Sequence, residues 1–143
     1  MKTFELEKMI RDLVEDNPFR KNIRYLISHP EFATEKYDHE GKERYINCCG
    51  TALFCTGYAE QERPVYVSPN VMNLIIDIGA VEIKRPGSLV IYRKDNDEIR
   101  HSALFLGKTN YKEFIFHKPG KDDEEFCFDV IGQNEDAEYY FLR

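Results

Sequence analysis

Two stretches in the first quarter of the chain have apolar residues that recur at helical spacing. They cover residues 6–14 and 20–28, and each predicts a helix with one apolar side. The next stretch, residues 30–44, is mostly polar. It predicts a loop with a turn at Gly41.

Two further helices are predicted near the middle of the chain. One begins just after Asn47, which is a good N-cap residue, and runs to about Tyr58. The other covers residues 70–78 and ends at Gly79. The residues expected to face inward from this second helix are apolar and follow helical spacing: Val71, Leu74, Ile75 and Ile78.

The pattern then changes to short apolar or alternating runs, which are typical of strands. The runs cover residues 88–93, 101–107, 113–118, 126–131 and 138–143. Polar turns separate them, the last one at Gln133-Asn134. Helices followed by a meander of strands predict an α+β fold, in which N-terminal helices pack on a C-terminal antiparallel sheet.

The length of 143 residues fits one domain, 1–143, with a helical extension over residues 1–44 and the core that carries the chemistry over 45–143. The formal net charge of −6 gives no electrostatic footprint for nucleic acid, and no apolar run is long enough to span a membrane. The first residues do not form a signal peptide, so a cytoplasmic location is expected. The oligomeric state is left open.

The sequence Asn-Cys-Cys-Gly at 47–50 places two adjacent thiols at a predicted helix start. The four cysteines are expected to be free thiols, and no C-x-x-C pair indicates a metal site. We therefore expect no cofactor, with a mixed Cys and His zinc site as a lesser alternative. A thiol in the first turn lies near outward-pointing N–H groups, which favour the thiolate. Helical spacing makes Cys48 the better nucleophile and Cys49 its neighbour, although buried structural thiols also fit the sequence.

A nucleophilic cysteine needs a base, usually histidine, and a group that orients this base. A helix C-cap explains His29, and His39 lies in a polar stretch, whereas His101 and His117 lie at the ends of strongly apolar strands. A three-residue turn between these strands would place the two rings on one face of the sheet. A two-residue turn would place them on opposite faces, and residues 108–110 permit either.

Four segments resemble, in order, the motifs of the NlpC/P60 cysteine peptidases, which belong to the papain-like group. The segments are NCCG (47–50), GSLVIY (87–92), HSALFLG (101–107) and FIFHKPG (114–120). The family has D-C-S-G at a helix start, a GDLVFF-like strand, HVGIYLG, and a strand that ends in FIHA. The resemblance covers about residues 45–120 and implies a papain-like fold. It also implies that Cys48 is the nucleophile, His101 the base and His117 the group that orients the base.

The chain departs from the family pattern at Asn47, Cys49 and Ser88, where the family has Asp, Ser and Asp. Family members are also usually exported. These differences weaken the assignment to peptidoglycan more than they weaken the catalytic trio. Tyr45, three residues before Cys48, is expected to line the substrate pocket.

The leading hypothesis is a thiol hydrolase, a cysteine peptidase or amidase that cleaves an amide or isopeptide bond. By resemblance, its substrate would be a peptide or a peptidoglycan fragment. An acyltransferase or deamidase could use the same residues. Asp129 could then orient His101, although a solvent-facing strand residue fits Asp129 better. A third hypothesis is a non-catalytic binding or immunity-type protein on the same fold.

Overall fold

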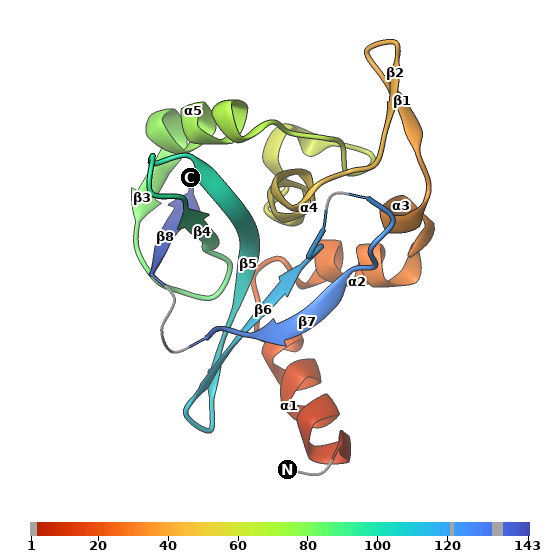
Figure 1. Cartoon of the computed structure of the whole chain (residues 1–143). Helices are drawn as coiled ribbons and strands as arrows, with labels where there is room; N and C mark the ends of the chain where they lie inside the picture. Colours follow the sequence, from red (N-terminus) through yellow and green to blue (C-terminus); the bar gives the residue numbers. More distant parts are fainter. Residues whose placement is uncertain (1–2, 121, 133–135) are drawn as a thin grey trace.

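The computed structural model describes residues 3–120, 122–132 and 136–143, so the turn predicted at Gln133-Asn134 lies outside the described residues (Figure 1). Helices and a small hairpin come first in the chain. They are α1 (Thr3–Glu15), α2 (Arg20–Ser28), α3 (Glu31–Thr34), β1 (Tyr37–His39), β2 (Lys42–Arg44), α4 (Cys48–Cys55), the 3-10 helix η1 (Tyr58–Glu60) and α5 (Pro69–Gly79). None of the helices in these described ranges is both long and apolar enough to cross a bilayer.

The main sheet is antiparallel, and within the described residues its strand order is β3-β8-β4-β5-β6-β7. Its strands are β3 (Ala80–Glu82), β4 (Leu89–Arg93), β5 (Ile99–Thr109), β6 (Lys112–His117), β7 (Cys127–Val130) and β8 (Ala137–Leu142). The predicted combination of helices with an antiparallel sheet is therefore confirmed. The meander holds from β4 to β7, but β8 returns to lie between β3 and β4.

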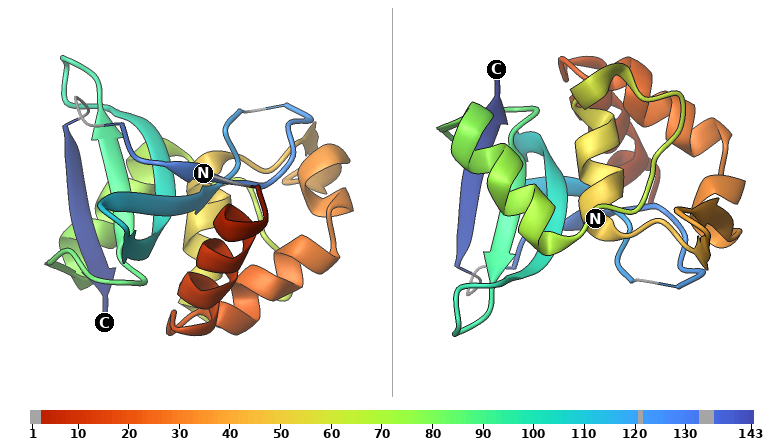
Figure 2. Two further views of the ribbon diagram at one scale, coloured as in Figure 1. Left: turned by 90° about the horizontal axis from the view of Figure 1, so that it is seen from below. Right: turned by 90° about the horizontal axis from the view of Figure 1, so that it is seen from above.

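Helix α4 lies in the middle of the hydrophobic core, between α5 on one side and α1 and α2 on the other (Figure 2). Phe54 and Cys55 pack with apolar residues of α1, α2, β5 and β6. Cys49 and Leu53 pack with apolar residues of α5 and β4. Because every residue from Cys49 to Cys55 is buried, the start of α4 is held firmly against the sheet.

The prediction of a loop over residues 30–44 is wrong, because this stretch contains α3 and the β1–β2 hairpin. The turn at Gly41 is confirmed, and Gly41 has a φ of +81°. The hairpin projects from the rest of the molecule (Figure 1). Its residues are exposed or only partly buried on both faces, so the sequence has no alternation of apolar residues that would signal a strand.

The inward face predicted for α5 is wrong at three of its four residues. Val71, Leu74 and Ile78 are 48%, 59% and 76% exposed, whereas Ile75 is partly buried against the core as expected. The residues that α5 buries fully are Met72 and Ile76. The helix has apolar residues on most of its sides, so their spacing does not select one face.

Gly50 lies where α4 touches the segment that precedes α5. A Cβ atom at Gly50 would lie 1.7 Å from the carbonyl oxygen of Val65 and 3.1 Å from Oδ1 of Asn47. A backbone carbonyl cannot rotate away as the end of a flexible side chain can. Any side chain at position 50 must therefore push α4 and the Val65 segment apart.

Gly50→Ala is expected to lower the free energy of unfolding by about 3 kcal/mol, because the added methyl group overpacks this contact. Gly79→Ala is the matched control, since no atom lies within 4 Å of its Cβ position. Its stability should be unchanged or higher by up to about 1 kcal/mol. Urea unfolding followed by circular dichroism measures both variants, and equal stabilities would contradict the contact at Gly50.

Candidate active site

Helix α4 begins at Cys48 because the side chain of Asn47 caps it. Oδ1 of Asn47 accepts hydrogen bonds from the N–H groups of Gly50, at 2.9 Å, and Val67, at 3.1 Å. Nδ2 of Asn47 donates to the Val67 carbonyl at 2.6 Å. The predicted N-cap is thus confirmed. An aspartate could accept the first two hydrogen bonds but could not donate the third, which gives a physical reason for asparagine here.

The two adjacent thiols have different surroundings. Cys49 is 1% exposed, and its Sγ lies 3.2 Å from Oγ of Ser102 on β5. Cys48 is partly exposed and contacts the His101 ring and the backbone N–H of Ser102. Cys48 is therefore the thiol of the pair that a substrate can reach.

The neighbours of Cys48 lower the pKa of its thiol well below the ordinary value. The largest cause is a hydrogen bond from the Cys49 thiol; His101 and the Ser102 N–H act in the same direction, while burial of Cys48 opposes them. The pKa of Cys49 is raised by the same hydrogen bond and by burial. The two opposite shifts favour the proton on Cys49 and the negative charge on Cys48.

A β-bulge in β5 determines that His101 and His117 lie on the same face of the sheet. Strands β5 and β6 are joined by a two-residue turn at 110–111, in which both residues have positive φ. Such a turn alone would place the two rings on opposite faces. The pairing register, however, shifts by one residue between Phe105 and Gly107, which restores the common face.

The two histidine rings are in direct contact. Nε2 of His101 lies 2.7 Å from Nδ1 of His117, and the rings are inclined at 76°. The ring of Tyr92 stacks on that of His101, with centroids 5.8 Å apart. Because Nε2 of His101 is engaged with His117, Nδ1 is the nitrogen that remains for Cys48.

His117 is 7% exposed, and its burial lowers the pKa of the ring; His101 acts in the same direction and Asp129 in the opposite one. A neutral His117 can accept from His101 at Nδ1 when its own proton is on Nε2. This Nε2 lies 3.6 Å from Oδ2 of Asp129. The hypothesis that Asp129 orients His101 is therefore corrected, because Asp129 faces His117.

Lys118 fixes the loop that follows β6. Its side chain is fully buried, and Nζ donates to the backbone carbonyls of Glu124, at 2.7 Å, and Asp122. Burial lowers the pKa of Lys118, while nearby carboxylates oppose this shift. The anchored loop carries Pro119 and Gly120, which form part of the wall beside the Cys48 thiol.

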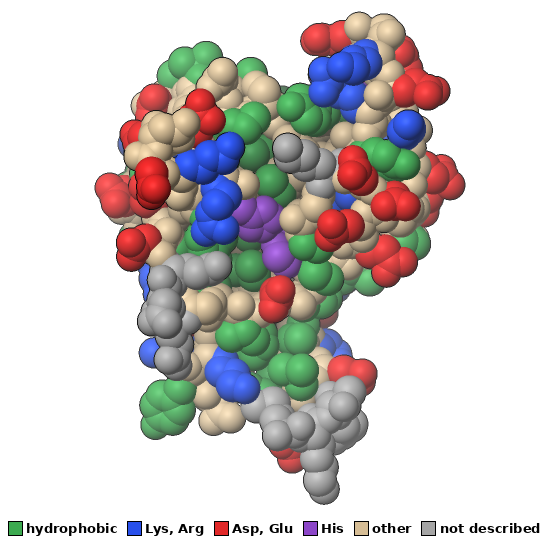
Figure 3. Space-filling model, viewed as in Figure 1, with side chains coloured by type: hydrophobic (Ala, Val, Ile, Leu, Met, Phe, Trp, Pro, Cys, Tyr) green, Lys and Arg blue, Asp and Glu red, His purple; other side chains and the backbone are tan. Residues whose placement is uncertain are grey.

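A cavity of about 370 Å³, which we call the thiol cavity, opens at Cys48. Its wall includes Cys48, His101, the ring of Tyr66 and the cations Lys94 and Arg100. Figure 3 shows histidine atoms reaching the surface with Lys and Arg atoms beside them. The thiol of Cys48, the ring of His101 and two cationic side chains therefore line one hollow.

The structure does not place Tyr45 in the thiol cavity. The ring of Tyr45 lies 5.5 Å from Nζ of Lys36, and the aromatic ring in the cavity wall is that of Tyr66. The sequence analysis missed Tyr66, because its place beside Cys48 depends on the hydrogen bonds between Asn47 and Val67. It also missed Lys118, Lys94 and Arg100, for which the sequence has no motif.

No protein-family model, no curated protein and no solved structure matches this chain. The described part of the chain has no group of three His, Cys, Asp or Glu side chains placed to hold a metal ion. The arrangement at the thiol cavity is a thiol of lowered pKa at a helix start, followed by two histidines and a carboxylate. Such an arrangement can attack an electrophilic carbon and transfer a proton.

Asp129→Asn is expected to lower the pKa of His117 further, because it removes the carboxylate that favours the charged ring. NMR titration of the His117 ring protons, assigned with a His117→Gln variant, measures the change. The side chain of Asp129 is 61% exposed, so high salt should reduce the difference. Asp12→Asn, on the exposed side of α1, is the matched control. A His117 pKa that stays the same or rises in Asp129→Asn would show that the two groups are not coupled.

Proposed function

We propose that the protein is a thiol hydrolase that cleaves an amide or isopeptide bond, on a papain-like fold of the NlpC/P60 type. The observation that carries the proposal is the 2.7 Å contact between Nε2 of His101 and Nδ1 of His117, with His101 against Cys48. This contact orients a base toward a thiol whose pKa is lowered. The order of the nucleophile helix and the two histidine strands agrees with the family resemblance over residues 45–120.

In the first half of the reaction, the Cys48 thiolate attacks the carbonyl carbon and a C–S bond forms. The carbonyl oxygen becomes an oxyanion, which the backbone N–H of Cys48 stabilises, because the first N–H groups of a helix have no partner within it. His101, protonated on Nδ1, then gives this proton to the leaving nitrogen. The C–N bond breaks, the amine leaves, and a thioester on Cys48 remains.

In the second half, neutral His101 takes a proton from a water molecule while the water oxygen attacks the thioester. The C–S bond breaks, the acid product leaves and the Cys48 thiolate is restored. His117 is a positioning residue in both halves. It accepts a hydrogen bond from Nε2–H of His101 and so stabilises the imidazolium that forms.

Two of the departures from the family pattern, at Asn47 and Ser88, have structural roles outside this proton path, whereas the third, Cys49, contacts the nucleophile. Asn47 binds the backbone of Val67, and Oγ of Ser88 donates to the Ile83 carbonyl at 2.7 Å. Cys49 donates a hydrogen bond to Cys48, a role that a serine hydroxyl could also fill. The family resemblance indicates peptides or peptidoglycan fragments as the substrate class.

With 4-nitrophenyl acetate, the protein is expected to release a burst of one equivalent of 4-nitrophenol and to carry an acetyl group on Cys48, detected by mass spectrometry. Cys48→Ala should abolish the burst, and His101→Ala should slow the hydrolysis of the acetyl-enzyme that follows it by about 100-fold or more, because the general base that activates water is lost. Cys127→Ser is the matched control, since it removes a thiol that does not line the thiol cavity. Equal bursts in the wild type and Cys48→Ala would contradict the proposal.

Cleavage of a peptide-amide library in ¹⁸O-labelled water separates hydrolysis from transfer to another acceptor. A hydrolase incorporates ¹⁸O into the new carboxylate, and this incorporation should depend on Cys48. An acyltransferase would instead join the acyl group to an added amine, with no ¹⁸O in that product. A protein that is acylated by neither amides nor the ester would be a binding protein on the same fold.

A further inference from the structure

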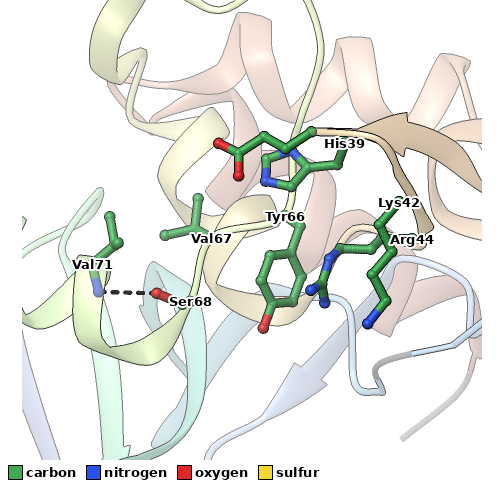
Figure 4. A pocket seen from close by; sticks show the side chains of 8 residues that line it. His39, Lys42, Arg44, Tyr66, Val67, Ser68 and Val71 are labelled. Atoms are coloured by element: carbon green, nitrogen blue, oxygen red, sulfur yellow. Dashed lines mark hydrogen bonds between the residues drawn. The ribbon is translucent and has the colours of Figure 1, made fainter.

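A second hollow, of about 460 Å³, lies between the β1–β2 hairpin and the start of α5 (Figure 4). We call it the cationic groove. The hairpin supplies His39, Lys42 and Arg44, and the opposite wall comes from the segment of Tyr66 and Val67. In Figure 4 the side chains of Lys42 and Arg44 extend from β2 alongside the ring of Tyr66.

The cationic groove and the thiol cavity share a wall. Tyr66 lines both hollows, and the next residue, Val67, is hydrogen-bonded through its N–H and its carbonyl to Asn47. Asn47 directly precedes Cys48. An extended chain that places a carbonyl at Cys48 can therefore continue past Tyr66 into the cationic groove.

The charge of the two hollows is opposite to that of the protein as a whole. The formal net charge of the chain is −6, yet the described residues that line the two hollows include the cations Lys42, Arg44, Lys94 and Arg100 and only one carboxylate, Glu40. Cations gathered in a concave site raise the local concentration of anionic ligands and speed their association.

These cations are available to a ligand. In the described part of the chain, Lys42, Arg44 and Arg100 form no ion pair with a carboxylate, and Lys94 has one distant partner, Glu98, at 3.9 Å. The guanidinium carbon of Arg44 lies 4.5 Å from the centroid of the Tyr66 ring, which holds the side chain at the groove. A guanidinium held in this way can bind a carboxylate through two hydrogen bonds.

We propose that the cationic groove binds an acidic peptide segment, so that the substrate carries carboxylate side chains close to the bond that reacts at Cys48. This proposal rests on the proposed function for the place of that bond. The Lys42 and Arg44 that carry it lie on a hairpin outside residues 45–120, the part of the chain that resembles the peptidase family. The specificity is therefore a feature of this chain's own extension.

The test measures peptide binding to the Cys48→Ala variant by fluorescence anisotropy. The probes are acetyl-Ala-Glu-Ala-Glu-Ala-amide with an uncharged fluorophore, the same peptide with Gln for Glu, and the same peptide with Lys for Glu. The Glu peptide is expected to bind about tenfold more tightly than the Gln peptide, and the Lys peptide most weakly. The preference should fall as salt is raised.

Two double variants, each of which removes two positive charges, show where the preference for the Glu peptide arises. Lys42→Gln with Arg44→Gln should abolish the preference for Glu over Gln, whereas Arg20→Gln with Lys21→Gln, which removes the same charge from the exposed side of α2, should retain it. Lys42→Arg with Arg44→Lys keeps the charge and should also retain the preference. This pair separates loss of charge from damage to the hairpin, which circular dichroism also reports.

The proposal would be overturned if the Glu and Gln peptides bind equally or if neither binds at millimolar concentration. It would also be overturned if the Lys42/Arg44 and Arg20/Lys21 double variants lose the preference for Glu to the same extent. Such results would leave the acetyl-enzyme formed on Cys48 untouched, so the proposed chemistry would stand without this specificity. A clear Glu preference in a protein that forms no acyl-enzyme would instead identify an acidic-peptide binding protein.

Discussion

The three hydrogen bonds of the Asn47 side chain join the parts of the site. One caps α4 and so places the Cys48 thiol at the helix start, while the other two hold Val67 against that start. The segment can come this close only because Gly50 has no side chain. Tyr66, carried by the same segment, then separates the thiol cavity from the cationic groove. One buried amide therefore places both the proposed nucleophile and the surface that we propose receives its substrate.

The sequence predicted the components of the site but could not predict their contact. Cys48, His101 and His117 were selected from a helix start and two strand ends. Whether the histidines share a face depends on the turn together with the bulge near Gly107, and a bulge has no reliable signal in a single sequence. Asp129 is largely exposed, as a solvent-facing strand residue would be, but its carboxylate lies near His117 and not near His101, which the sequence did not indicate.

The same limit applies to the fold. Helices with a clear apolar side and strands bounded by turns were predicted well, because local spacing determines them. The inward face of α5 and the hairpin over β1 and β2 were missed, since α5 is apolar on most sides and the hairpin buries neither face. The cations of the two hollows come from β2, the end of β4 and β5, and no local pattern brings these segments together.

The central claim is that Cys48 is a thiolate that His101 supports, and site-resolved alkylation tests it most directly. Limiting iodoacetamide would be applied from about pH 5 to 9 to the wild type and to His101→Ala, with each cysteine quantified by mass spectrometry. The account predicts that Cys48 reacts quickly even near pH 6, where thiols of ordinary pKa are protonated. Cys127, whose pKa is raised, should react only at alkaline pH. Without His101, Cys48 should lose part of its advantage, because the Cys49 thiol and the Ser102 N–H still lower its pKa. If Cys48 reacts no faster than Cys127 at any pH, the claim is contradicted.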